Sequence, residues 1–185
     1  MTTWNLCRIA LKAGAVTKTD LAAELSAVPE SSWITSQYPD QAGTIVWLPL
    51  VRISATGIWL GLDRRGVWTL GRLEGAVESS EKNLPSSWVT MLDSDEKSIR
   101  AELNITAERF GVSPSILQDL LPIEGVLSMA LRSRSDHWIE RALSWLSNRD
   151  LSREHLELLR EVSMTAWVNQ RTRHAARRLA RAAEE

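Results

Sequence analysis

Residues Thr44–Leu73 read TIVWLPLVRISATGIWLGLDRRGVWTLGRL and form the most apolar continuous stretch of the 185-residue chain. Three of the nine tryptophans lie in it. Aromatic and β-branched residues favour strands, and the run from Asp63 to Gly66 has the chemistry of a type I turn closed by a left-handed glycine. The stretch therefore predicts a three-stranded antiparallel meander, with strands at about Thr44–Ile53, Thr56–Leu62 and Val67–Leu73.

The segments on either side read as helices that cover this apolar sheet. Before the sheet, apolar spacing and capping residues predict helices at Trp4–Ala13, Thr17–Ser26 and Pro29–Ser36. Beyond Asp95 the chain reads as helical, and it ends in one long helix from a cap at Ser152 to about Ala182. We expect an α+β fold with N-terminal helices, a Trp-rich three-stranded antiparallel meander and a C-terminal helical bundle.

The composition divides the chain into three parts. Residues 1–78 hold the first helices and the meander, residues 79–95 form an acidic linker, and residues 96–185 form a helical domain that ends in the Arg-rich helix. Six acids and one lysine lie between Glu74 and Glu96. Trp88 and Val89, which are apolar residues within this polar segment, are expected to dock back onto the core.

The bulk properties exclude several kinds of site. The net charge is −1, so no global field attracts nucleic acid or an anionic membrane. Cys7 is the only cysteine, which rules out an intramolecular disulfide and a cysteine-based zinc site. The N-terminus lacks a secretory signal, and no stretch reaches the ~18 apolar residues of a membrane span, so a cytoplasmic protein without membrane contact is expected.

Catalytic patterns are scarce in this sequence. The three histidines, His137, His155 and His174, lie far apart and have no metal-ligand spacing. No G-x-S-x-G elbow, P-loop or G-x-G-x-x-G motif is present. We therefore expect a non-enzymatic protein with no metal and no cofactor.

Residues Leu103–Leu121, LNITAERFGVSPSILQDLL, resemble a helix-turn-helix. Ala107 is the small residue four positions before the turn glycine, Gly111. Ser113 is a suitable N-cap for the second helix, and Pro114 suits its first turn. The resemblance covers about a tenth of the chain and implies that the second helix binds DNA.

The exposed face of that second helix is expected to carry Ser115, Gln118 and Asp119. Glutamine can read adenine and serine can contact phosphate, whereas Asp119 would repel the DNA backbone. Thr106 also stands where the motif usually has an apolar residue. Because the same corner packs two helices in proteins that bind no DNA, a purely structural role is the alternative.

Helices followed by an arginine-tipped hairpin also resemble, loosely, a winged-helix DNA-binding module. In that arrangement Thr17–Ser26 and Pro29–Ser36 are the helical pair, and Arg64 and Arg65 form the tip of the wing. An extra strand before the hairpin departs from the pattern. The alternative is two helices packed on a sheet, with two solvated arginines at a turn.

The C-terminal helix carries the sharpest physical signal. At 100° per residue, one side collects five arginines and one histidine: Arg171, Arg173, His174, Arg177, Arg178 and Arg181. Like charges along one side of a helix repel each other. An acidic partner, a phosphate backbone or the chain's own acidic segment would relieve this repulsion. The alternative is a solvated face whose arginines complement the helix dipole.

Two functions follow from these signals. The first is a nucleic-acid-associated or regulatory protein that uses the helix-turn-helix-like corner and the Arg-rich helix. The second is a protein–protein interaction module, such as an adaptor, an immunity protein or a complex subunit, because tryptophan and arginine are enriched at interface hot spots. The expected partner is nucleic acid or an acidic protein surface. The sequence leaves the oligomeric state open, a dimer included.

Overall fold

The computed structural model describes residues 18–39, 43–53, 57–81 and 83–183. The first part has the order α1 (Lys18–Leu25), η1 (Glu30–Ser32), β1 (Ile34–Gln37), β2 (Thr44–Arg52), β3 (Ile58–Asp63), β4 (Trp68–Arg72), β5 (Val77–Ser79) and η2 (Ser86–Asp93). The second part is helical, with α2 (Glu96–Phe110), α3 (Pro114–Leu120), α4 (Ile123–Arg132), α5 (Asp136–Leu146), α6 (Arg153–Met164) and α7 (Gln170–Ala182). The α+β class is confirmed. The predicted helix Trp4–Ala13 and the Thr17 cap lie outside the described residues.

The sheet has five strands where three were predicted, in the antiparallel order β1-β2-β3-β4-β5. The predicted strands correspond to β2, β3 and β4, and the sheet curls so that Gln37 and Ala76 form a parallel bridge between its two edges. The prediction of a helix at Pro29–Ser36 was wrong. That segment makes only the 3₁₀ turn η1 and then enters β1, because pairing with β2 uses its β-branched residues, Ile34 and Thr35.

The turn between β3 and β4 forms as predicted. Gly66 has φ +74°, a left-handed conformation that suits glycine. The buried carboxylate of Asp63 accepts hydrogen bonds from the backbone amides of Arg65 at 2.8 Å and Val67 at 2.9 Å. This side chain therefore holds the hairpin tip in one conformation.

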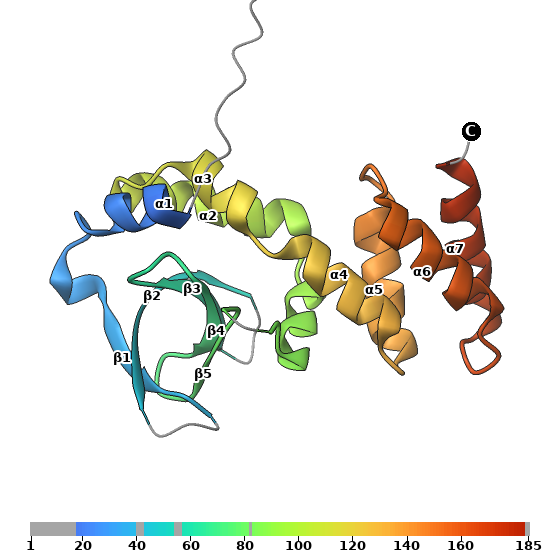
Figure 1. Ribbon diagram of the computed structural model, residues 1–185, viewed down its shortest axis with the longest axis horizontal. Coiled ribbons are helices and arrows are strands. Elements are labelled where there is room, and N and C mark those ends of the chain that lie inside the picture. The colour runs from blue at the N-terminus through green and yellow to red at the C-terminus, as the bar shows by residue number, and fades with distance from the viewer. Residues whose placement is uncertain (1–17, 40–42, 54–56, 82, 184–185) are drawn as a thin grey trace, which may run out of the picture.

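The residues on the two faces of the sheet contribute to two different hydrophobic clusters. Inside the curl, Ile45, Trp47 and Val77 pack together. The other face contributes Leu48, Leu60 and further residues to a core that continues without a break into α7. Helices α1, α2 and α3 lie over the sheet in Figure 1, and α4 to α7 extend away from it.

The acidic segment that was predicted to be a linker, residues 79–95, starts at the last residue of β5 and contains the 3₁₀-helix η2. As expected, Trp88 and Val89 of η2 are buried. Helix η2 contacts both α4 and α5, so it connects the sheet region to the C-terminal helices. The hydrophobic cluster therefore continues through this segment.

The prediction of one long helix after Ser152 was wrong. The chain leaves α6 at Met164 and starts α7 at Gln170. Asn169 caps α7, because its side-chain oxygen accepts a hydrogen bond from the Thr172 amide at 2.9 Å. The backbone amide of Asn169 donates a hydrogen bond to the carboxylate of Asp136 in α5 at 3.1 Å. These local caps outweigh the helical periodicity that runs through the segment.

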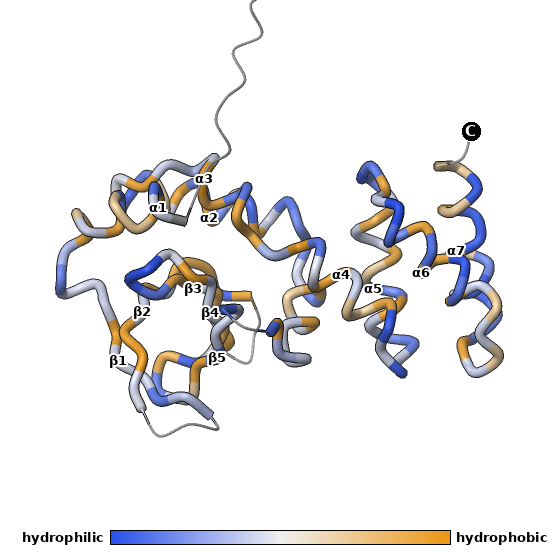
Figure 2. The backbone as a smooth tube through the Cα atoms, viewed as in Figure 1, coloured by the Kyte–Doolittle hydropathy of each residue, from blue (hydrophilic) through white to orange (hydrophobic). Residues whose placement is uncertain are grey.

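The C-terminal helices form two stacked hairpins. α4 packs against α5 and α6 packs against α7, while α4 also contacts α6 and α5 also contacts α7. This two-layer stacking is the arrangement found in α-solenoids. Figure 2 shows hydrophobic and hydrophilic residues alternating along α5, α6 and α7, as expected for helices that bury one side. None of the helices in the described ranges is long and apolar enough to cross a membrane.

Candidate protein-interaction surface

Helix α7 presents the six residues that the sequence grouped on one side, here called the α7 arginine face: Arg171, Arg173, His174, Arg177, Arg178 and Arg181. Five of them are exposed, and Arg173 is half-buried. The opposite side buries Thr172, Ala176 and Ala180 against the neighbouring helices. The small alanines let α7 approach α5 and α6 closely, which leaves the guanidinium groups on the outside.

The α7 arginine face lacks the ion pairs that other arginines make. Seven arginines elsewhere in the chain pair with carboxylates: Arg64, Arg65, Arg100, Arg132, Arg141, Arg149 and Arg153. The face's arginines form no ion pair within 4.0 Å with any residue in the described ranges. Arg177 donates one hydrogen bond, to the Ser163 carbonyl at 3.3 Å. In the described ranges these five arginines therefore have no carboxylate within ion-pair distance.

The chain's acidic segment does not neutralise this face. Glu81 pairs with Arg65, and Asp93 lies beside His137 and Arg141. Glu96 pairs with Arg100 and Arg149. These carboxylates are engaged near the sheet and at the start of α2, whereas α7 lies at the far end of the helical stack in Figure 1.

A groove of about 480 Å³ lies between α5 and α7, beside the arginine face. Its apolar lining includes Leu143, Ala175 and Leu179. Arg171 and Arg178 line it from α7, and Glu140 lines it from α5. The sequence revealed the arginines of this site but not its α5 wall. The only signal for that wall was the helical spacing of residues 140, 143, 144 and 147.

Glu140 joins the two walls at the N-terminal end of the groove. Its carboxylate accepts hydrogen bonds from the Thr172 hydroxyl at 2.9 Å and from the side-chain amide of Asn169 at 3.3 Å. These two hydrogen bonds, with a smaller contribution from the charge of Arg171, lower the pKa of Glu140. The carboxylate therefore stays ionised and already has partners on its own chain.

We expect Glu140→Gln to lower the melting temperature at pH 7 and to lower it less at acid pH. A carboxylate with a lowered folded-state pKa stabilises the fold above its unfolded pKa, near 4.5 for this group, and the stabilisation is lost as the pH falls through the folded value. The difference in melting temperature between wild type and variant should therefore shrink below about pH 4. Circular dichroism melts at pH 7 and pH 3.5 measure it, and a pH-independent difference would contradict this role.

The predicted hairpin-tip arginines lie away from α7 and are paired. Arg64 pairs with Glu30, and Arg65 forms hydrogen bonds to both Asp63 and Glu81. The carboxylates of Glu81 and Asp63 raise the pKa of Arg65. Because Pro29–Ser36 supplies a strand instead of a second helix, the winged-helix order of elements is wrong. In Figure 1 the sheet that carries this hairpin lies at the opposite end of the molecule from α7, so the hairpin tip and the α7 arginine face do not form one surface.

The helix-turn-helix corner forms from α2, Gly111 at φ +68°, and α3. Ser113 does not cap α3 with its side chain, because its hydroxyl and amide both donate to Glu24 at 2.7 Å. Thr106, the residue that departs from the motif, donates to the Leu50 carbonyl of β2 at 3.1 Å. Hydrogen bonds therefore connect this corner to α1 and to the sheet.

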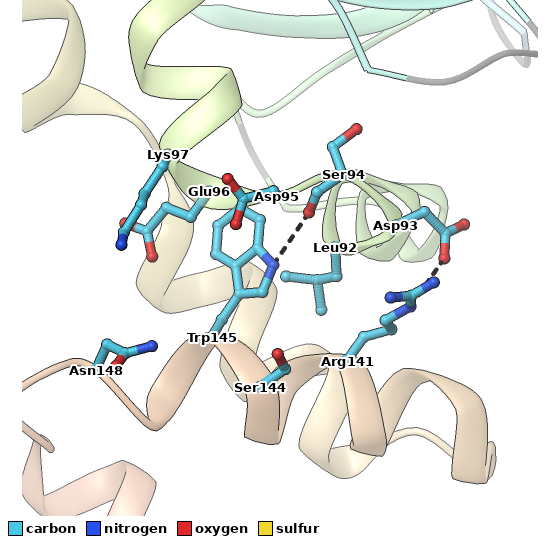
Figure 3. Close-up of a pocket in the computed structure, with 10 residues that line it drawn as sticks. All are labelled: Leu92, Asp93, Ser94, Asp95, Glu96, Lys97, Arg141, Ser144, Trp145 and Asn148. Atoms are coloured by element: carbon cyan, nitrogen blue, oxygen red, sulfur yellow. Dashed lines mark hydrogen bonds and ion pairs between the residues drawn. The ribbon is translucent and has the colours of Figure 1, made fainter.

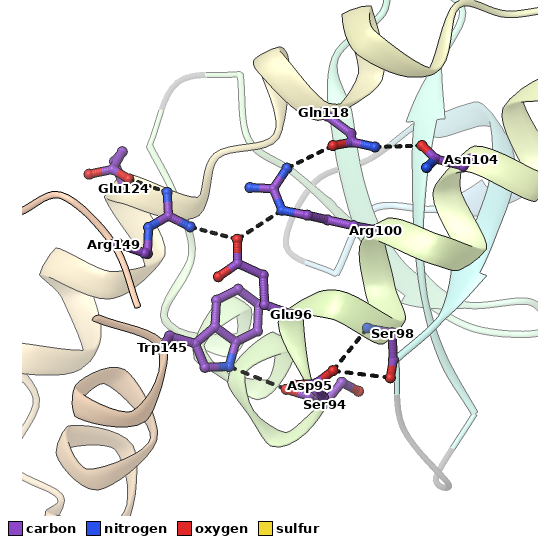
Figure 4. Close-up of polar contacts among 10 residues, drawn as sticks. All are labelled: Ser94, Asp95, Glu96, Ser98, Arg100, Asn104, Gln118, Glu124, Trp145 and Arg149. Carbon is purple, nitrogen blue, oxygen red and sulfur yellow. Dashed lines mark hydrogen bonds and ion pairs between the residues drawn. The ribbon is translucent and has the colours of Figure 1, made fainter. Parts of the chain in front are cut away.

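On α3, Ser115 and Asp119 are exposed and Gln118 is half-buried. Gln118 belongs to the polar network in Figure 4, where its side-chain oxygen accepts a hydrogen bond from Arg100 at 3.1 Å and its amide donates to Asn104. The amide group that was predicted to read a base is thus engaged within the chain. The exposed side of α3 presents a hydroxyl and an anion.

Two other hollows each contain an ion pair within the chain. The cleft of about 300 Å³ in Figure 3, at the start of α2, contains the Arg141–Asp93 pair at 3.5 Å and a hydrogen bond from the Trp145 indole to the Ser94 carbonyl at 3.3 Å. The described residues that line it include no histidine. A wider hollow of about 920 Å³ between η2 and α4 has the Arg132–Glu154 pair at its rim.

The histidines lie on three different helices. His137 contacts Asp93 at 2.9 Å, His155 is buried 3.4 Å from Glu124, and His174 is exposed beside Gln170. Among the residues that the structure describes, no three His, Cys, Asp or Glu side chains are grouped so that they could hold a metal ion.

Comparison with known proteins identifies no similar protein. No protein-family model matches the chain, and searches of curated proteins and of solved structures found no significant match.

Proposed function

We propose that the protein is a non-enzymatic, cytoplasmic interaction module that binds an acidic segment of a partner protein at the groove between α5 and α7. One observation carries the proposal: the α7 arginine face has no ion-pair partner in the described ranges and borders an apolar groove. An anionic partner would relieve the repulsion among these arginines, and burial of the apolar lining would add to the affinity.

The layout of the helices supports a binding role. Stacked helical hairpins expose an extended surface on each of their two layers, and α-solenoids bind partners on such surfaces. Here α5 and α7 form one layer, and their shared groove is open to the outside. Arginine is also enriched among the hot-spot residues of protein interfaces.

A protein partner accounts for more of these features than nucleic acid does. A phosphate backbone would contact Arg171 and Arg178 but would leave the partly exposed Ala175 and Leu179 of the groove uncovered. The hairpin-tip arginines are paired, and α3 presents Asp119 without a cation beside it on its exposed side. Nucleic-acid binding through the α7 arginines is the second candidate, and the same experiment separates the two.

The test compares poly-L-glutamate with a 20-base-pair DNA of random sequence, each titrated into the full chain at several salt concentrations. We expect poly-L-glutamate to bind, and Arg171→Glu/Arg178→Glu to weaken it about 10- to 100-fold, since two attractive contacts become repulsive. The matched control is Arg132→Glu/Arg153→Glu, which makes the same charge change at exposed arginines outside the groove and should have little effect.

Two results would contradict the proposal. One is poly-L-glutamate binding that responds equally to both double variants, which would mean that only net charge matters. The other is binding of DNA alone, with affinity that falls steeply with salt and is lost in Arg171→Glu/Arg178→Glu. The second result would establish the nucleic-acid alternative.

A further inference from the structure

We infer that the partner segment is an amphipathic α-helix that lies along the groove and carries two carboxylates seven residues apart. This inference rests on the proposed function and adds the conformation and charge pattern of the partner. It follows from the spacing of the groove residues, from the hydrogen bonding of the two walls and from the placement of their charges.

Both walls of the groove are helices with residues at helical spacing. The α7 wall has Arg171, Thr172, Ala175, Arg178, Leu179 and Ala182, and the α5 wall has Glu140, Leu143, Ser144 and Ser147. These positions recur at intervals of three and four, so each wall is a straight stripe along its helix. The Asn169–Asp136 and Thr172–Glu140 hydrogen bonds follow one another from the N-terminal ends of both helices, so α5 and α7 run side by side in the same direction. The α7 wall is about 16 Å long at 1.5 Å per residue.

The two walls of the groove favour a helical partner segment over an extended one. An extended peptide exposes backbone amides and carbonyls that need partners. The backbones of α5 and α7 are committed to their own helices, and the Ser147 hydroxyl already donates to the Ser144 carbonyl at 2.7 Å. A helix satisfies its own backbone, and its side-chain ridges fit between two neighbouring helices. Ala175 and Ala182 allow it to approach closely.

The charges fix how such a helix is rotated about its axis. Arg171 and Arg178 are seven residues apart, which places them two turns or about 10.5 Å apart on the α7 wall. Carboxylates at positions i and i+7 of the partner match this separation. Glu140 stands on the α5 wall and would repel acids there. The partner's acids therefore face α7, and apolar residues at i+3 and i+4 face Leu143 and Leu179.

The experiment uses two 21-residue helical peptides of identical composition. The first carries glutamates at i and i+7 beside a leucine stripe, and the second carries the same glutamates on the side opposite the leucines. We expect the full chain to bind the first at least about tenfold more tightly in fluorescence anisotropy. Ala175→Phe, which fills the groove, should weaken that peptide about tenfold. Ser144→Phe fills the groove from an exposed position on α5 and gives the same readout should Ala175→Phe disturb the fold.

Each outcome decides the inference. Preference for the first peptide, lost in the groove-filling variants, supports it. Equal binding of both peptides, or binding of poly-L-glutamate without either peptide, overturns it while the proposed function stands. Failure of all three probes to bind overturns both.

Discussion

We expect Trp88→Ala to lower the free energy of unfolding by about 3–5 kcal/mol. Trp88 lies on η2, which contacts α4 and α5, and its side chain is fully buried in the main core. Removal of the indole leaves a cavity where the sheet region meets the helical stack, and the surrounding helices can fill it only in part. Urea denaturation followed by circular dichroism measures the change.

Two further variants make this prediction specific. The Trp88 indole N–H has no hydrogen-bond partner in the part of the chain that the structure describes. Trp88→Phe keeps most of the apolar volume and removes that buried donor, so it should cost less than about 1.5 kcal/mol. Trp167→Ala removes a tryptophan that is 50% exposed and should cost less than about 1 kcal/mol. A Trp88→Ala protein as stable as Trp167→Ala would contradict the account of the core.

The second large effect is expected from Gly61→Ala, at about 2–3 kcal/mol. A Cβ at this position would lie 2.3 Å from the Leu48 carbonyl oxygen and 2.7 Å from Cε3 of Trp47. Gly61 pairs with Pro49 at the point where the register between β2 and β3 shifts. The backbone therefore has to move in order to admit the methyl group, which disturbs the centre of the sheet.

The matched control is the same substitution at Gly125 in α4. There a Cβ would meet only the Cδ2 end of Leu84 at 3.3 Å, and that side chain can turn away. Alanine also favours a helix over glycine by about 0.5–1 kcal/mol, so Gly125→Ala should be neutral or slightly stabilising. Thermal melts of both variants test the pair, and equal melting temperatures would show that Gly61 has room for a side chain.

The central strands were predictable because their signals are local. Aromatic and β-branched residues and the Asp63–Gly66 turn lie within one stretch of sequence. Strands β1 and β5 have four and three residues, and pairing with β2 and β4 stabilises them more than their own composition does. The break between α6 and α7 had a local signal in Asn169, but the helical periodicity on both sides of it hid that cap.

Only the α7 wall of the groove could be predicted from the sequence. The arginine grouping on α7 follows from 100° per residue, and α7 is oriented as that spacing indicates. The α5 wall depends on which helices stack, and a single sequence does not show this. The pairing of Arg64 and Arg65 is likewise set by Glu30 and Glu81, which lie 34 and 16 residues away in the sequence.

The most direct test of the central claim is a ¹H–¹⁵N chemical-shift titration of the labelled full chain with the helical peptide that carries glutamates at i and i+7. The account predicts that the largest shifts fall on the two walls of the groove, residues 140–147 and residues 171–182. Largest shifts on the β3–β4 turn or on α3, or no shifts at millimolar peptide, would contradict it.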